Sequence, residues 1–384
     1  MRPLAGSNHE RYSARALKVM YIVGARPNFV KMAPVITEVR RVLPDAHHIL
    51  VHTGQHYDPM MSAVIMEELG LPAPDYVLRV GSASHAVQTA RAMERIEAVI
   101  EIERPDLVIV SGDVNSTLAA TLVAVKLGVP LAHVEAGLRS FDRTMPEEIN
   151  RIVADEFSDQ LFIHSDEALE NLQAEGIEPN RIHFVGNTMI DTLVAMEDRF
   201  RGLGAASGLG LTAGEYLLVT LHRPALVDGP MLFDVLDQLS RIASELPVVF
   251  PIHPRVRKRV ENIALAPSAR LLDPLGYLEF LSLQADAAAV LTDSGGVQEE
   301  TTYLGIPCFT LRDNTERPVT VRAGTNMLLG LDPSRIADIP SAIRPKAHAM
   351  HRPPGWDGHA AERIAAVICG EPAQMAPPLV GARG

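Results

Sequence analysis

The sequence predicts an α/β fold made of two Rossmann-like domains that face each other across a cleft. Three observations predict this architecture. Short runs rich in Val, Ile and Leu alternate with helical patterns, which is typical of parallel strands covered by helices on both faces. The alternation pauses in a stretch rich in Gly and Ala, residues 201–215, and then resumes. A chain of 384 residues is also long for one hydrophobic core, so two domains are expected.

The first domain is predicted at residues 18–200, after a mobile arm at residues 1–17. Apolar runs indicate its strands, and the helical spacing that follows each run indicates its helices. The expected strand and helix pairs are residues 18–24 and 28–42, 47–54 and 60–69, 106–113 and 116–127, 130–137 and 147–157, and 160–166 with a helix that ends at 175.

The second domain is predicted at residues 216–370, beyond a linker at residues 201–215. It repeats the alternation of the first domain. The expected strand segments are 216–222, 248–254, 264–275, 287–296 and 307–313, with helices near 231–246 and from Val297. The tail at residues 371–384 is rich in Pro and small residues and is predicted to be disordered.

The composition excludes several classes of protein. The formal net charge of −12 argues against nucleic acid and against an anionic membrane as partners, because both repel an acidic protein. The two cysteines, Cys308 and Cys369, make neither a disulfide framework nor a metal site, which favours a reducing compartment. The apolar run at residues 19–23 is too short for a signal peptide or a membrane span. A cytoplasmic protein is therefore expected.

Four carboxylates are candidates for proton transfer. Asp113 and Glu135 each follow an apolar run, and the carboxyl ends of strands in an open α/β sheet border the ligand crevice, so we expect these two side chains to meet there. Glu147 and Glu148 lie in the acidic segment that follows. Thr144 and Glu147 also match a capping box, in which the glutamate only satisfies a backbone N–H at the start of a helix. Catalysis and capping remain equally open for Glu147.

One segment predicts a phosphate site. Ser294, Gly295 and Gly296 lie between a predicted strand and a helix, where backbone N–H groups and the helix dipole favour an anion. A plain helix cap at Ser294 is the structural alternative. Glu299 and Glu300, about one turn into the helix, favour a ligand, because they could reach sugar hydroxyls beside a phosphate.

Basic residues and histidines add two further candidates. Arg26 and Lys31 put positive charge at the N-terminus of the first helix, which is unfavourable unless an anion offsets it. We therefore expect them to bind an anion. His222 and His253 each follow a strand of the second domain. A lone histidine is more often structural, but two at equivalent strand ends favour a substrate-binding site.

In these motifs the sequence resembles the non-hydrolysing UDP-N-acetylglucosamine 2-epimerases. The resemblance covers roughly residues 18–330, and many motifs in one order are far more specific than a single loop. The motifs are GARPNFVKMAPV, TGQHYD, GDVNSTLA, HVEAGLRS, MPEEINR, VGNTMID, LHR, PIHP, LTDSGGVQEE and TERPVTVRAGT.

The resemblance implies a fold similar to the two-domain GT-B glycosyltransferases and roles for individual residues. It implies that the catalytic residues are Asp113, Glu135, Glu147 and His222. It implies that the UDP diphosphate binds at Ser294, Gly295 and Gly296, with Glu300 on the ribose hydroxyls, Phe280 against the uracil, and Arg26, Lys31 and Arg317 facing the nucleotide.

The implied activity is inversion at C2, which interconverts UDP-N-acetylglucosamine and UDP-N-acetylmannosamine for cell-surface polysaccharide precursors. UDP is eliminated to give 2-acetamidoglucal and then adds back, without cofactor or metal, and a homodimer is expected. Three alternatives stay open: an epimerase of UDP-glucose or of a UDP-diacetamido-uronic acid, a UDP-sugar glycosyltransferase of the same fold, and an inactive nucleotide-sugar sensor.

Overall fold

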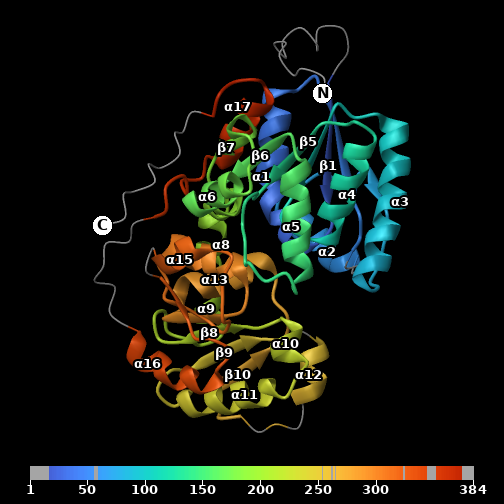
Figure 1. The fold of residues 1–384 in the computed structure, drawn as a ribbon. Coiled ribbons are helices and arrows are strands. Elements are labelled where there is room, and N and C mark those ends of the chain that lie inside the picture. The colour runs from blue at the N-terminus through green and yellow to red at the C-terminus, as the bar shows by residue number, and fades with distance from the viewer. Residues whose placement is uncertain are drawn as a thin grey trace. The chain divides into compact units, whose positions relative to one another are not determined.

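The computed structural model describes residues 17–55, 59–252, 254–260, 263, 265–322, 325–343 and 352–373. The chain forms two compact units. The first unit comprises the chain up to Thr192 and from Pro354 onward, and the second comprises Leu193–Pro353. Each unit contains one parallel β-sheet with flanking helices (Figure 1), which confirms the predicted α/β class with two Rossmann-like sheets.

The sheet of the first unit has, among the described residues, seven strands in the order β3-β2-β1-β4-β5-β6-β7, and each adjacent pair is parallel. The strands are β1 (Lys18–Val23), β2 (His47–His52), β3 (Tyr76–Val77), β4 (Leu107–Ser111), β5 (Leu131–Val134), β6 (Gln160–Ile163) and β7 (Ile182–Phe184). Because parallel strands share one carboxyl edge, the loops after β1, β4 and β5 lie at the same edge of the sheet.

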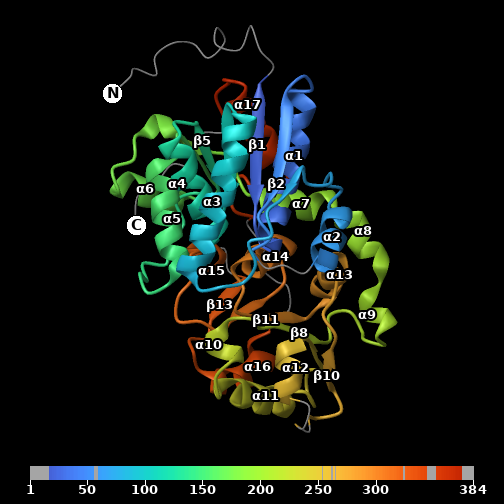
Figure 2. The ribbon, with the colours of Figure 1, turned by 90° about the vertical axis from the view of Figure 1, so that its right-hand side faces the viewer.

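Helices cover both faces of this sheet. Figure 2 shows α1 on one side of β1 and α3 on the other. Apolar residues of α3 and α4 form one core cluster with Met20 and Ile22 of β1. The helices are α1 (Arg26–Val42), α2 (Pro59–Glu68), α3 (His85–Glu103), α4 (Asn115–Lys126), α5 (Pro146–Phe157), α6 (Asp166–Ala174), α7 (Thr188–Ala195) and α17 (Ala360–Ile368). The sequence pattern did not predict α3, α7, β3 or β7.

The sheet of the second unit is also parallel, with six described strands in the order β10-β9-β8-β11-β12-β13. They are β8 (Leu217–Thr220), β9 (Val248–Pro251), β10 (Ala269–Leu272), β11 (Ala289–Thr292), β12 (Cys308–Thr310) and β13 (Asn326–Leu328). The longer helices are α11 (Met231–Ile242), α13 (Tyr277–Asp286) and α14 (Gly295–Leu304), and the shorter ones are α8 (Glu197–Leu203), α9 (Ala205–Gly208), α10 (Pro224–Val227), α12 (Pro254–Val260), α15 (Pro318–Arg322) and α16 (Ile339–Ala342). Of the helices described in either unit, none is long and apolar enough to span a membrane.

The two units differ from the predicted boundaries in two places. Residues 201–215, expected as a linker, contain the end of α8 and all of α9, and the Ala205 N–H donates to Ser282 Oγ of α13 at 3.2 Å. Helix α17, expected in the second domain, belongs to the first unit. There the indole Nε1 of the buried Trp356 donates to the His164 carbonyl at 3.1 Å. The predicted arm and most of the predicted tail, residues 1–16 and 374–384, lie outside the described residues.

Asp191 of α7 explains why α17 belongs to the first unit. Its buried carboxylate accepts hydrogen bonds from the backbone N–H groups of Ala360 at 3.1 Å and Ala361 at 2.6 Å, the first residues of α17. The first N–H groups of a helix have no partner within the helix, so a carboxylate placed there stabilises its start. A residue far away in the sequence thereby caps the C-terminal helix.

The burial of the Asp191 carboxylate should make stability depend on pH, because burial outweighs the two backbone hydrogen bonds, which act to lower its pKa. Burial raises the pKa of Asp191 from an ordinary 3.8 to about 6. The folded protein then binds a proton more tightly than the unfolded chain, so the free energy of unfolding should fall as the pH rises from about 4 to about 6. In Asp191→Asn this fall should be smaller. Urea titrations at several pH values, followed by the fluorescence of Trp356, the single tryptophan, measure it. If the free energy of unfolding depends on pH equally in both proteins, Asp191 does not have a raised pKa in the folded state.

Candidate active site

Glu135 lies directly after β5 in a strained backbone conformation. Its φ of 68° falls in the left-handed region, which is costly for a residue with a side chain and is common at functional sites. The Glu135 carboxylate is buried and forms an ion pair with Lys31 of α1, which is 5% exposed. The anion that Lys31 contacts is thus a carboxylate of its own unit, and contact between Lys31 and a substrate stays a prediction.

The carboxyl ends of β4 and β5 come together at Gly112. The Gly112 N–H donates to the Val134 carbonyl at 3.0 Å. A Cβ at Gly112 would lie 3.1 Å from both Glu135 Oε2 and Lys31 Nζ, so the absence of a side chain gives the ion pair its room. Glu135 therefore lies beside the residue that precedes Asp113, at the shared strand edge that the sequence indicated.

Asp113 is held by the first two turns of α5. Arg151 forms an ion pair with the Asp113 carboxylate, and Asn150 Nδ2 donates to the Asp113 carbonyl at 2.8 Å. The Asp113 side chain keeps 23% of its surface exposed, so solvent or a ligand can reach it. Asn150 and Arg151 lie in the MPEEINR motif, but neither was predicted as a site residue.

The adjacent glutamates at the start of α5 differ in their surroundings. Glu148 is 1% exposed, accepts the Ser140 and Phe141 N–H groups at 2.9 and 2.8 Å, and pairs with Arg151 at 2.9 Å. Glu147 is half-buried, and its carboxylate has no hydrogen bond or ion pair within the described part of the chain. Glu148, one of the predicted candidates for proton transfer, therefore holds the loop before α5, whereas Glu147 makes no such contact.

The capping box predicted for Thr144 and Glu147 is wrong. Helix α5 begins at Pro146 with Met145 at the N-cap, and no side chain caps it there. The Thr144 hydroxyl and N–H both donate to Asp142 Oδ1, at 2.6 and 2.9 Å. Thr144 therefore forms its hydrogen bonds within the turn at Asp142 and does not cap α5. Helix capping by a Thr144 and Glu147 pair thus does not account for Glu147.

A fully buried histidine links α5 to the loop that carries Asp113. His133 Nδ1 lies 2.7 Å from Asp155 Oδ1, and His133 Nε2 lies 2.8 Å from the Gly112 carbonyl. Arg139 donates to Asp155 Oδ2 at 2.7 Å. Burial raises the pKa of Asp155, but hydrogen bonds and charge from His133 and Arg139 outweigh burial and bring the pKa below its usual value. None of these three residues was predicted as part of a site.

In the second unit, His222 follows β8 and is oriented by a buried carboxylate. Asp293 accepts the backbone N–H groups of His222 and Arg223 at 2.9 and 2.8 Å, and His222 Nδ1 lies 2.8 Å from Asp293 Oδ1. The His222 side chain itself is 59% exposed. The other predicted strand-end histidine, His253, lies outside the described residues.

Arg317 lies directly on the N-terminus of α14. A Cβ at Gly295 would be only 2.3 Å from Arg317 Nη1, so the close approach requires glycine. The Arg317 Nε lies 3.0 Å from Glu299 Oε1, and its Nη1 lies 3.4 Å from Glu316 Oε2. Two predicted phosphate-binding features, the Gly295 turn and Arg317, therefore lie side by side. Glu299 forms an ion pair with Arg317.

The remaining nucleotide candidates lie on the same helices or at the start of α1. Ser294 occupies the N-cap position of α14 without capping it through its side chain. Glu300 is 3% exposed and accepts the Tyr277 hydroxyl at 2.9 Å. Phe280 is half-buried against the apolar cluster below α13. Arg26, the first residue of α1, is exposed.

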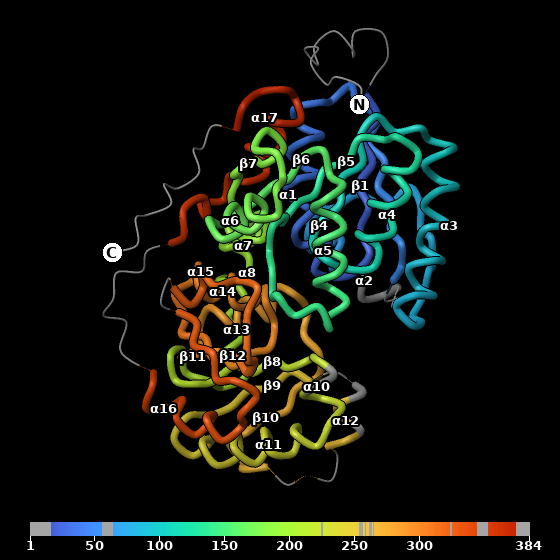
Figure 3. The backbone as a smooth tube through the Cα atoms, in the orientation of Figure 1, coloured from blue at the N-terminus to red at the C-terminus, as the bar shows by residue number. Residues whose placement is uncertain are grey.

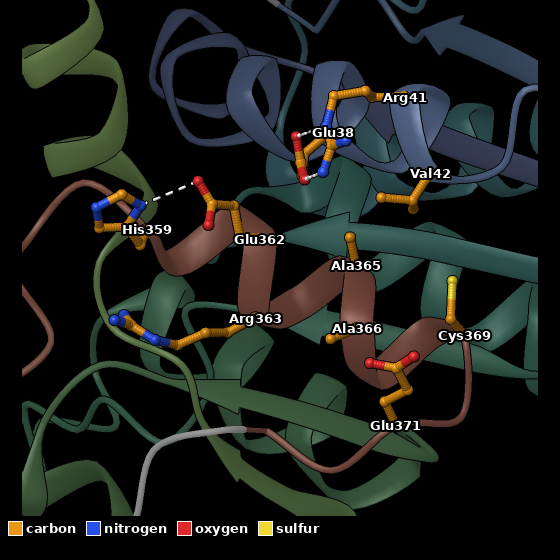
Figure 4. A pocket seen from close by; sticks show the side chains of 10 residues that line it. All are labelled: Glu38, Arg41, Val42, His359, Glu362, Arg363, Ala365, Ala366, Cys369 and Glu371. Atoms are coloured by element: carbon orange, nitrogen blue, oxygen red, sulfur yellow. Dashed lines mark hydrogen bonds and ion pairs between the residues drawn. The ribbon is translucent and has the colours of Figure 1, made fainter.

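A separate hollow of about 750 Å³ lies between α1 and α17 (Figure 4). Two pairs of its charged side chains contact each other: Glu38 with Arg41 at 2.5 Å and His359 with Glu362 at 2.9 Å. None of the predicted site residues lines it. This hollow is therefore not the candidate active site.

Several known proteins are similar to this chain in sequence and in fold. A family model described as UDP-N-acetylglucosamine 2-epimerase matches residues 40–369. The UDP-N-acetylglucosamine 2-epimerase of Methanocaldococcus jannaschii is 40% identical over 364 residues, covering 92% of this chain and 99% of that one. The UDP-2,3-diacetamido-2,3-dideoxy-D-glucuronate 2-epimerase of Pseudomonas aeruginosa is 44% identical over 319 residues, covering 82% and 88%.

Solved structures are similar to this chain as well. The M. jannaschii UDP-GlcNAc 2-epimerase in complex with UDP-GlcNAc and UDP has a TM-score of 0.84 at 39% identity, covering 92% of this chain and 100% of that one. A glycotransferase of kitacinnamycin has a TM-score of 0.58 at 13% identity, covering 93% and 99%, and shares the fold alone.

Proposed function

The chain belongs to the UDP-N-acetylglucosamine 2-epimerase family, and we propose that it interconverts UDP-N-acetylglucosamine and UDP-N-acetylmannosamine by inversion at C2. One observation carries the proposal furthest. Asp113 and Glu135 extend from the carboxyl ends of neighbouring strands, and α5, which holds Asp113, presents a half-buried Glu147. Several carboxylates at one sheet edge suit a reaction that removes a proton and returns it from another direction.

The proposed reaction is an elimination followed by addition. A carboxylate takes the proton from C2, the electron pair forms the C1–C2 double bond, and the bond between C1 and the UDP oxygen breaks. The products are 2-acetamidoglucal and UDP. UDP then adds back at C1, and a proton reaches C2 from the opposite face. Asp113, Glu135 and Glu147 share these proton transfers in the proposal.

The second unit supplies the proposed nucleotide contacts. Diphosphate oxygens gain negative charge as the C1–O bond breaks, and the N-terminus of α14 with Arg317 offers N–H groups and positive charge for them. His222 is assigned to the same step. Glu300 is assigned to the ribose hydroxyls, and Phe280 to the uracil.

A second substrate has a specific observation in its favour. The relative that acts as a UDP-2,3-diacetamido-2,3-dideoxy-D-glucuronate 2-epimerase has 44% identity to this chain, against 40% for the UDP-N-acetylglucosamine 2-epimerase of M. jannaschii. The elimination is the same for both sugars, since both carry an acetamido group at C2. Only the groups at C3 and C6 separate them.

NMR in D₂O tests the proposal and separates the two substrates. Incubating the protein with UDP-N-acetylglucosamine should yield UDP-N-acetylmannosamine with deuterium at C2, because a proton held on a carboxylate exchanges with solvent. Asp113→Asn serves as the control for a contaminating activity. Turnover that retains all protium at C2 would exclude the elimination. Turnover of the diacetamido-uronate alone would favour the second substrate, and UDP release only with an added acceptor would indicate a glycosyltransferase.

A further inference from the structure

The buried carboxylate of Asp293 contacts both the backbone of the loop that carries His222 and the His222 ring. It directly follows β11 and is 0% exposed. Its Oδ2 accepts the backbone N–H groups of His222 and Arg223, which fixes the loop after β8. Its Oδ1 lies 2.8 Å from the ring Nδ1 of His222. The same carboxylate therefore contacts both the backbone of this loop and the ring of His222.

The chemistry of the carboxylate determines which ring nitrogen carries a proton. Burial raises the pKa of Asp293, but the hydrogen bond and charge of His222 and the two backbone N–H groups outweigh burial, so the pKa lies below its usual value. Asp293 is therefore ionised at neutral pH. An ionised carboxylate only accepts hydrogen bonds, so Nδ1 of His222 must be the donor. A proton can then be gained or lost only at Nε2.

We propose that Asp293 is a positioning residue that holds His222 as the Nδ1-protonated imidazole and so presents Nε2 to the UDP-sugar. This inference rests on the proposed function, in which His222 acts on the nucleotide. The ring is 59% exposed, and the contact to Asp293 fixes which edge of the ring faces the protein. When Nε2 gains a proton, the positive charge on the ring is stabilised by a carboxylate 2.8 Å away.

Asp293→Asn tests the proposal, because asparagine keeps an oxygen for the two backbone N–H groups. Its amide N–H then faces Nδ1 of His222, and a donor there requires Nδ1 to be unprotonated. The ring proton should move to Nε2, and kcat should fall by roughly 10²-fold or more while affinity for UDP changes little. Nitrogen-15 NMR of the full chain labelled at histidine reports which nitrogen is protonated, and His222→Gln identifies the signal.

Thr292→Val is the matched control. It removes the hydroxyl that accepts the Ser294 N–H at 3.0 Å in the same turn, without touching His222. It should leave the His222 ring proton on Nδ1, so a moved proton in Asp293→Asn would be specific to the carboxylate. If kcat falls in Asp293→Asn while the proton stays on Nδ1, Asp293 only holds the loop and the proposal is overturned.

The spectrum of the unsubstituted protein gives a second test that does not depend on the folding of any variant. A His222 ring protonated at Nε2 alone would overturn the proposal. This measurement needs no substrate, so it is separate from the proposed function. Lack of epimerase activity in the unsubstituted protein would refute the function and leave the spectroscopic result standing.

Discussion

Replacing Glu147 with glutamine is expected to lower kcat by roughly 10²-fold or more and to leave the unfolding midpoint nearly unchanged. The Glu147 carboxylate has no hydrogen bond or ion pair among the described residues, so the substitution breaks no contact that stabilises the fold. It does remove the ability to transfer a proton. Steady-state rates with the accepted UDP-sugar and thermal unfolding of the same preparation measure the two effects.

Glu148→Gln is the matched control at the adjacent position. Glu148 is 1% exposed and pairs with Arg151 at 2.9 Å, so its neutralisation should lower the free energy of unfolding by about 1–3 kcal/mol. The pair of variants should thus separate activity from stability. Near-normal turnover in Glu147→Gln, with or without a change in stability, would remove Glu147 from the mechanism.

Gly295→Ala is expected to weaken UDP binding by roughly 10- to 100-fold, which corresponds to one hydrogen bond to a charged group. The new Cβ would lie 2.3 Å from Arg317 Nη1, so the guanidinium must move away from the N-terminus of α14. Isothermal titration with UDP gives the affinity without requiring turnover.

Gly208→Ala is the control for adding a methyl group in the same unit. A Cβ at Gly208 meets nothing within 4 Å, so UDP affinity should stay at the unsubstituted value. Unchanged affinity in Gly295→Ala would show that Arg317 does not need its present position to bind the nucleotide.

The sequence predicted most of the strands and the residues at their ends, because these depend on local pattern, but it did not predict the short strands β3, β7 and β13. Apolar runs marked β1, β4, β5 and β11, and polar residues at strand ends such as Asp113 and Glu135 followed directly. The missed features depend on contacts between distant residues. Nothing local in the sequence of α17 shows that Asp191 caps it, so the helix was assigned to the wrong side of the domain boundary.

The same limit applies within the site. Glu147 and Glu148 are adjacent and chemically identical, and only the folded loop shows that Glu148 is the one that binds Ser140 and Phe141. Asp293 could be recognised as the start of a glycine-rich turn, but its contact to His222 joins β11 to β8, which are far apart in the sequence and adjacent only in the sheet.

The position of α17 has a consequence for how the protein is made. The second unit is one continuous segment, Leu193–Pro353, inserted into the first. During synthesis the strands of the first unit emerge early, but Trp356 and the residues of α17 that Asp191 caps, Ala360 and Ala361, leave the ribosome only after the whole second unit has been translated. The amino-terminal unit is therefore the last to be completed, and a nascent chain arrested before residue 354 carries its sheet with the surface for α17 still open to other proteins.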